Sequence, residues 1–370
     1  MNKLLLLALP LGLFGASGLP YFVNDIHGYL PKNQGDIGIE VLKMNDVVDI
    51  LNIKEDEFGG NLSETSIGDM NGLSIFGRYK LRDDLMIGAK YQKSDISFGL
   101  GELNNKKLET YLRKNLLSKN FAVDFGIIQN SANDISPKNL NLTDNRINDI
   151  TNATDVTIVA NIPNNDGDYI CSNLYSHCLS WTKSDGQIFK EGINSSSFKD
   201  AIDSKDINYD VTTKNMKDNT LFIRAIKSVY NDIDTVDISL AYSQTKITTE
   251  VETNIYYKNE ELNALQNLDR NENKITLGIN YSAFVGKWAM DALYEYDYFL
   301  RDDDLGYINH NHKIDINIGY EIFKNVKFFV GGKIMSNQFN GEIPYLYNKY
   351  TQTSFDHKYG WAKTGLVYSF

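Results

Sequence analysis

Ten charged residues, in two groups far apart along the chain, could act on a charged solute. Each alternates with apolar neighbours, as on one face of a strand. On facing walls of a tube, the two groups would create a transverse field that orients and filters charged or dipolar solutes. Alternatively, they pair with neighbours and fill the interior. The basic group is Arg78, Lys80, Lys90, Lys107 and Arg113; the acidic group is Asp291, Glu295, Asp297, Asp315 and Glu321.

The two cysteines are the next candidates for chemistry. Cys171 and Cys178 are the only cysteines of the chain. A pair in one loop of an exported protein meets an oxidising compartment, so we expect a disulfide. His177 lies beside Cys178, but two cysteines and one histidine do not match the spacing of zinc sites. We therefore expect no metal site and no cofactor.

Residues 1–18 have the pattern of a secretory signal peptide. Lys3 precedes an apolar run from Leu4 to Phe14, and small residues follow up to Gly18. Removing Lys3 from the 37 basic residues leaves 36 against 48 acidic ones, a net charge of −12. Nucleic acid is an unsuitable partner for so acidic a chain, because phosphate binding needs a basic face. We expect residues 19–34 to form a periplasmic lead.

Strict alternation of apolar and polar residues dominates the rest of the sequence. Such runs predict strands with one apolar and one polar face, and five pairs of them are joined by short polar links typical of hairpins. An opening strand and a closing strand bring the count to an even twelve. The expected strands are 36–44, 73–81, 85–92, 108–116, 121–127, 221–230, 236–242, 275–283, 288–298, 314–322, 326–330 and a last one ending at Phe370.

The links between these hairpins are expected to be long: 45–65, 93–105, 130–219, 247–273, 301–311 and 339–357. Short and long links that alternate are typical of a transmembrane barrel with short periplasmic turns and long extracellular loops. The sequence thus predicts an all-β, up-and-down antiparallel barrel over 35–370. The large insertion at 130–219 either folds inward as a constriction or caps the outside. Alternation at Val156, Ile158, Ala160 and Ile162 leaves open a count of fourteen strands.

The end of the chain resembles the terminal signature of Gram-negative outer-membrane β-barrels. Leu366, Tyr368 and Phe370 occupy the alternate apolar or aromatic positions of that signature. The resemblance implies that these side chains are read by the barrel-assembly machinery. It also implies a location in the outer membrane, in contact with lipid and lipopolysaccharide. No histidine lies in the His-x-Ser-Asn-Gly arrangement of outer-membrane phospholipases, and no nucleophile and base pair is recognisable, so we expect no enzyme.

Two functions of such barrels fit the sequence. The first is a porin-like channel for the passive passage of small hydrophilic solutes or ions, narrow because twelve strands enclose less space than the sixteen of wide pores. The second is a non-conducting surface-display or adhesin-type barrel that binds partners through its large loop. The channel is the primary expectation.

Overall fold

The computed structural model describes most of the strands and several of their links. The chain divides into two compact units, a barrel unit (1–132, 217–247 and 270–370) and a second unit (133–216 and 248–269). Among the described residues, no helix is long and apolar enough to cross a membrane. The described residues are 34–44, 67–98, 101–116, 120–134, 162–163, 169–170, 179–182, 188–193, 207–230, 234–257, 260–301, 305–306, 308–348 and 355–370.

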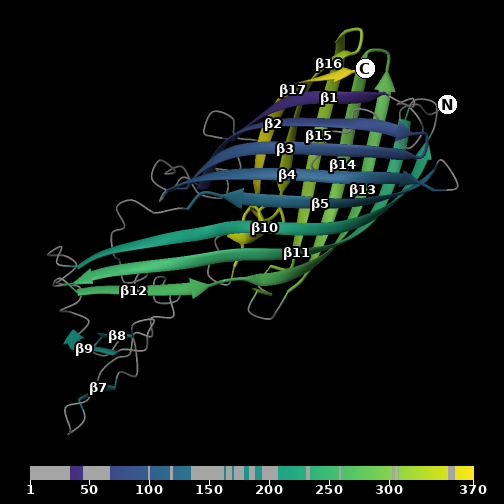
Figure 1. The fold of residues 1–370 in the computed structure, drawn as a ribbon. Helices are drawn as coiled ribbons and strands as arrows, with labels where there is room; N and C mark the ends of the chain where they lie inside the picture. Colours follow the sequence, from purple (N-terminus) through teal and green to yellow (C-terminus); the bar gives the residue numbers. More distant parts are fainter. Residues whose placement is uncertain are drawn as a thin grey trace. The chain divides into compact units, whose positions relative to one another are not determined.

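Twelve antiparallel strands form the closed barrel (Figure 1). Each of them pairs with its neighbour in the sequence order of the barrel, and β1 also pairs with β17, from Asp36 opposite Ser369 to Lys43 opposite Ala362. The twelve predicted strands and the up-and-down order are thereby confirmed. The strands are β1 (Gly35–Met44), β2 (Ile67–Arg82), β3 (Leu85–Phe98), β4 (Gly101–Asn115), β5 (Phe121–Ala132), β10 (Ile207–Tyr230), β11 (Asp234–Tyr257), β13 (Arg270–Val285), β14 (Trp288–Leu300), β15 (His310–Phe323), β16 (Val326–Met335) and β17 (Tyr359–Ser369).

The second unit contains short pairs of strands. β6 (Ile162–Pro163) pairs with β7 (Tyr169–Ile170), and β8 (Leu179–Thr182) pairs with β9 (Ile188–Ile193). The far part of β11 pairs with β12 (Glu260–Asn267), from Glu250 opposite Asn267 to Tyr257 opposite Glu260.

Two of the expected long links are wrong. Residues 93–105 are mostly strand, because β3 and β4 stay paired up to Phe98 opposite Gly101. Residues 247–273 are likewise mostly strand, in β11, β12 and the start of β13. Outward positions there are polar, such as Lys93 and Glu102 in the first stretch and Asn267 and Asn271 in the second. A strand beyond the lipid needs no apolar outer face, so the alternation used to find strands is missing there.

Side chains alternate between a buried inner face and an exposed apolar outer face along the barrel strands. In β1, Ile37, Ile39 and Val41 are exposed, whereas Asp36 and Glu40 are buried. Exposed apolar side chains on most of the strands form a band. Soluble proteins rarely expose so large an apolar surface. It is the surface that outer-membrane barrels present to lipid. The band includes Leu73, Ile75, Ile87, Leu112, Phe125, Ile127, Leu221, Ile238, Leu240, Leu277, Ile318, Val330 and Leu366.

Aromatic rings lie over glycines of adjacent strands on the inner face. Phe76 is opposite Gly38, and Tyr111 is opposite Gly88. A Cβ added at either glycine would collide with the ring. Only glycine leaves room for a ring this close to the neighbouring backbone. Phe222 over Gly126 and Phe329 over Gly365 repeat the arrangement.

These rings belong to an apolar layer inside the barrel, near the short-turn ends of the strands. Met86 of β3 and Ala289 of β14, both next to short turns, lie on strands six positions apart in the ring of twelve and join the same cluster. The layer therefore crosses the lumen from wall to wall. Its members are Phe76, Met86, Tyr111, Ala289, Phe329 and Val367, with Phe222 and Phe284 packed against them.

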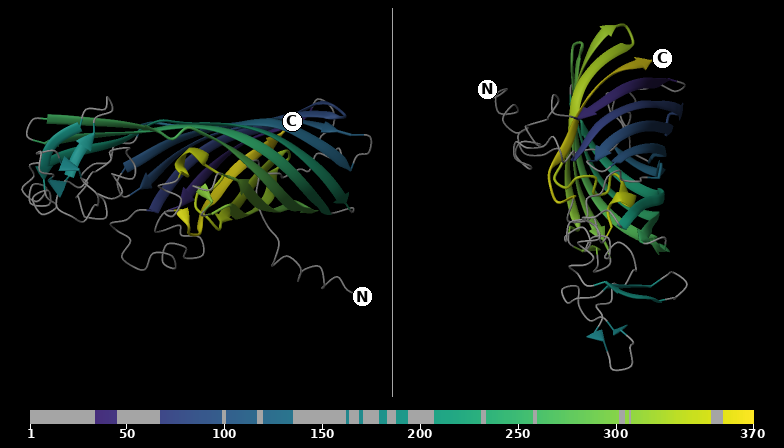
Figure 2. Two further views of the ribbon diagram at one scale, coloured as in Figure 1. Left: turned by 90° about the horizontal axis from the view of Figure 1, so that it is seen from below. Right: turned by 90° about the vertical axis from the view of Figure 1, so that its left-hand side faces the viewer.

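The connection from β16 to β17 turns into the barrel (Figures 1 and 2). Within it, we call residues 336–348 the inward segment. Phe339, Ile343, Tyr345 and Tyr347 of this segment are buried. Gly341 has a positive φ of 78°, which glycine adopts without strain. A larger residue there would also meet the Phe299 ring of the wall at 2.6 Å.

Candidate functional site

Ion pairs line the lumen beside β1. Arg78 and Asp36 are register partners on β2 and β1, and the Arg78 Nε donates to Asp36 Oδ1 at 3.1 Å. Glu40 lies four residues further along β1. It accepts a hydrogen bond from Ser74 Oγ at 2.6 Å and forms an ion pair with Lys90. Both carboxylates are buried. Arg78 of β2 and Lys90 of β3 thus have acidic partners on β1.

A second group joins three adjacent strands. Asp124 of β5 lies between Arg113 of β4 and Arg224 of β10. Its Oδ1 is 2.8 Å from Arg113 Nε, and its Oδ2 is 2.9 Å from an Arg224 nitrogen. Two guanidinium groups therefore share one buried carboxylate, with the charge-assisted hydrogen bonds that such burial requires.

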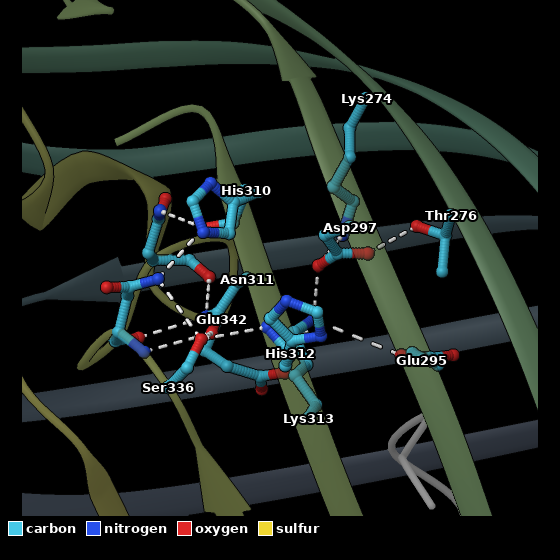
Figure 3. Close-up of polar contacts among 12 residues, drawn as sticks. Lys274, Thr276, Glu295, Asp297, His310, Asn311, His312, Lys313, Ser336 and Glu342 are labelled. Carbon is cyan, nitrogen blue, oxygen red and sulfur yellow. Dashed lines mark hydrogen bonds and ion pairs between the residues drawn. The ribbon is translucent and has the colours of Figure 1, made fainter. Parts of the chain in front are cut away.

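Asp297 of β14 is the centre of a third group (Figure 3). Lys274 Nζ is 3.0 Å from its Oδ2, Lys313 Nζ is 2.5 Å from the same oxygen, and Thr276 Oγ1 donates to Oδ1 at 2.5 Å. Glu295 lies farther away, with its Oε2 3.9 Å from Lys313 Nζ. The lysines come from β13 and β15, the two neighbours of β14.

The ten charged residues named from the sequence all lie on barrel strands. They do not form one basic wall and one acidic wall, because the lumen surface around each group also contains residues of the opposite charge. Asp36, Glu40 and Asp124 lie among the basic group, and Lys313 and Lys363 among the acidic one. Buried members are Arg78, Lys80, Lys90, Arg113, Asp291, Glu295, Asp297 and Asp315; Lys107 and Glu321 are half-buried.

The sequence contained signals for these missing partners. Asp36 and Glu40 alternate with outward residues of the opening strand, so their parity alone pointed inward. Lys313 has the same parity as Asp315 on one strand, and Lys363 Nζ reaches Asp315 at 2.5 Å across β16. Counting every inward charge, rather than the most conspicuous stretches, would have found them.

Glu342 of the inward segment is a candidate functional residue that no pattern in the sequence indicated. Its carboxylate is 2.5 Å from Lys333 Nζ, 3.2 Å from Lys313 Nζ and 3.5 Å from Lys107 Nζ. Burial alone would raise the pKa of Glu342, but the charges of Lys333, Lys107 and Lys313 outweigh burial and hold that pKa well below its usual range. The side chain is therefore a carboxylate at neutral pH.

Arg301 anchors the inward segment to the end of β14. Its guanidinium lies 3.9 Å from the Phe299 ring centre and 4.0 Å from that of Tyr347. It donates to Asn340 Oδ1 at 2.6 Å and forms an ion pair with Glu272 at 2.5 Å. Two cation–π contacts together with these polar contacts fix the planar group.

Further hydrogen bonds attach the segment to other strands. Tyr345 donates its hydroxyl to Asn105 Oδ1 of β4 at 2.8 Å. Arg270 of β13 donates to the Pro344 carbonyl at 2.8 Å, and Asn311 of β15 donates to the Asn337 and Asn340 carbonyls at 2.9 and 2.7 Å. The segment is tied to the wall by these polar contacts and also by ring packing, with the Phe339 ring centre 4.8 Å from that of Tyr359 in β17.

Two small cavities lie in the lumen on either side of Glu342. One has a volume of about 40 Å³ and is lined by Lys90, Lys333 and Lys363; the other, of about 90 Å³, is lined by Lys274 and Lys313. Lys107 and Glu342 line both cavities. A water needs about 10–15 Å³ of such space, so each cavity has room for a few waters.

The predicted assembly signal lies on β17 and at the chain end. Leu366, Tyr368 and Phe370 are all exposed on the outer face. Phe370 stacks on Tyr79 at 6.4 Å and on Tyr368 at 6.2 Å between ring centres. Recognition of these side chains by the assembly machinery stays a prediction.

Several expectations fall outside the described residues. These are the signal peptide at 1–18, all but the last residue of the 19–34 lead, and the disulfide between Cys171 and Cys178. Within the described part of the chain, no group of three or more histidine, cysteine, aspartate or glutamate residues is arranged to hold a metal ion.

No family model and no curated protein matches the chain. Solved structures similar to it include the translocator domain of the autotransporter NalP from Neisseria meningitidis (9% identity, 93% of this chain and 91% of that one, TM-score 0.47). The KdgM porin has 8% identity over 90% of this chain and 99% of its own, with a TM-score of 0.38. The P. putida toluene transporter TodX has 8% identity over 96% of this chain and 94% of its own, with a TM-score of 0.43.

Proposed function

We propose that the protein is a narrow outer-membrane channel for small hydrophilic solutes, closed by the inward segment. The observation behind the proposal is that this segment occupies a polar lumen and is tied there by ion pairs and hydrogen bonds, led by those of Glu342. Polar contacts can be exchanged for contacts with water or solute, whereas a close-packed core cannot be opened so readily. The polar lining suits hydrophilic cargo.

Opening requires two changes. The inward segment must leave the lumen, which would enlarge the two cavities that Glu342 lines. The apolar layer of Phe76, Met86, Tyr111, Phe329 and their neighbours must also admit water. Apolar constrictions of channels gate by wetting and drying, so this layer acts as a second barrier.

Planar-bilayer recording tests the proposal. A variant in which residues 338–346 are replaced by a Gly/Ser linker should conduct more, and stay open longer, than the wild type. Silence of both proteins, with folding confirmed by circular dichroism, contradicts the channel.

The apolar layer favours a second candidate, the non-conducting surface-display barrel. It crosses the lumen near the short-turn ends, as in a barrel that only supports its loops. Under this function both proteins stay silent. Excision of 133–206 then abolishes binding to cells or matrix, while the barrel still folds.

A further inference from the structure

Three lysines from two sides of the barrel converge on the Glu342 carboxylate. Lys107 is on β4 and Lys313 is on β15, strands six positions apart in the ring, and Lys333 is on β16 beside β15. Their Nζ atoms are 3.5, 3.2 and 2.5 Å from Glu342 oxygens. One carboxylate thus forms ion pairs with lysines on opposite walls of the barrel.

Two of these lysines depend on Glu342 for their charge partner. Lys313 also contacts Asp297 at 2.5 Å and Glu295 at 3.9 Å. For Lys107 and Lys333, Glu342 is the only carboxylate within ion-pair distance among the described residues. A buried cation without a partner is strongly unfavourable. Withdrawal of Glu342 would therefore leave a site that demands an anion.

The surroundings provide room as well as charge. Lys107 lines both cavities, whereas Lys333 lines the first and Lys313 the second. Neutral hydrogen-bonding groups are also present, from Gln92 and Asn105 in the first cavity and from Thr220 in the second. When the carboxylate of a ligand binds between the lysines, the rest of the ligand has space in either cavity. Because each cavity holds only a few waters, the ligand must be small.

We propose that Lys107, Lys313 and Lys333 form a binding site for a small carboxylate solute, which Glu342 fills in the closed barrel. The chain's own carboxylate is then a tethered mimic of the ligand, and the solute competes with it for the three ammonium groups. This site deepens the proposed function, on which it rests for its role in passage, by naming the class of solute. Its binding, however, can be measured in detergent without any conduction.

Calorimetric titration with glutarate tests the site, because one end of glutarate reproduces the glutamate side chain. E342A removes the competing carboxylate and leaves space, so it should bind glutarate at least tenfold more tightly than the wild type. E342A/K333Q should lose that gain. E342A/K114Q should keep it, because Lys114 pairs with Asp84 beside a short turn, away from the lumen. Glutaramide, the neutral analogue, should not bind.

The outcomes separate the site from the channel. Glutarate binding no tighter in folded E342A than in the wild type overturns the site, and phosphate binding as tight as that of glutarate overturns the carboxylate assignment. If E342A does not fold, E342Q serves instead, since its amide keeps the shape without the charge, and glutarate should raise its melting temperature more than that of the wild type. No such rise overturns the site. Glutarate binding without conductance supports the binding site and contradicts the channel. Conductance without glutarate binding supports the channel and contradicts the binding site.

Discussion

Gly35 and Phe370 exchange two backbone hydrogen bonds, from Gly35 N to Phe370 O at 3.0 Å and from Phe370 N to Gly35 O at 2.9 Å. They join the first residue of β1 to the last residue of the chain. The Phe370 ring also stacks on Tyr79 of β2. The C-terminal residue is therefore part of the seam that closes the barrel, as well as a candidate assembly signal.

Deletion of Phe370 should reduce barrel stability more than F370A does. The alanine variant loses the ring contacts, which contribute about 0.5–1.5 kcal/mol per aromatic pair. Deletion also removes the two backbone hydrogen bonds, at about 0.5–1.5 kcal/mol each. Urea unfolding in detergent micelles, followed by the electrophoretic shift of the folded barrel, measures the difference. F323A is the control, because Phe323 is 70% exposed at the end of β15, beside the short turn to β16. Equal stability of the deletion and F370A would show that the seam bonds contribute nothing.

The twelve strands could be predicted because lipid and lumen impose opposite requirements on alternate side chains. In β1, the alternation from Asp36 to Val41 distinguishes the lumen face from the lipid face without reference to the partner strands. Residues 93–105 and 247–273 lack this constraint, so polar strands there looked like loops.

The inward segment could not be predicted, because its fold depends on partners far away in sequence. Glu342 and Lys107 are 235 residues apart, and Tyr345 and Asn105 are 240 apart. Nothing within 336–348 indicates which wall it will meet. The same holds for the charges: Arg78 and Lys90 looked unpaired until the register brought Asp36 and Glu40 beside them.

Replacement of Gly88 by alanine should destabilise the barrel through its contact with Tyr111. The new Cβ would enter the space of the ring, and overpacking of this kind costs about 1–3 kcal/mol. In a double-mutant cycle, Y111A should absorb most of that cost, so the double variant is less destabilised than the sum of the single ones. Urea unfolding gives the four free energies. Strict additivity would mean that the ring and the glycine do not interact.

R301K should loosen the inward segment while leaving the strands intact. Lysine keeps the charge near Glu272 but loses the planar contact with Phe299 and Tyr347 and the hydrogen-bond fork toward Asn340. Loss of the two cation–π contacts, at about 0.5–1 kcal/mol each, and of one hydrogen bond, at about 0.5–1.5 kcal/mol, costs about 1.5–3.5 kcal/mol together. Hydrogen exchange should show faster exchange at 337–347, with β1 and β17 unchanged. Uniform acceleration over the whole barrel would instead assign Arg301 to global stability.

Acidification should release the inward segment through Glu342. The charged groups that face it are Lys107 from β4, Lys313 from β15 and Lys333 from β16. Because the pKa of Glu342 is lowered in the folded state, its contribution is complete above the ordinary glutamate pKa of about 4.3 and is lost as the pH falls through the lower folded value. A hydrogen bond to a charged group contributes about 1.5–3 kcal/mol, so protection of 339–347 should fall tenfold or more.

Hydrogen exchange between pH 6 and pH 3, corrected for the intrinsic rates, measures this release. Other lumen carboxylates, such as Asp297, are also paired with lysines, so E342Q is the essential control. Its segment should already exchange fast at pH 6, because the lysines face an uncharged amide, and should respond little to acid. Parallel loss of protection in the wild type and E342Q would assign the acid response to those other carboxylates. A response confined to the wild type links the closed lumen to the single charge of Glu342.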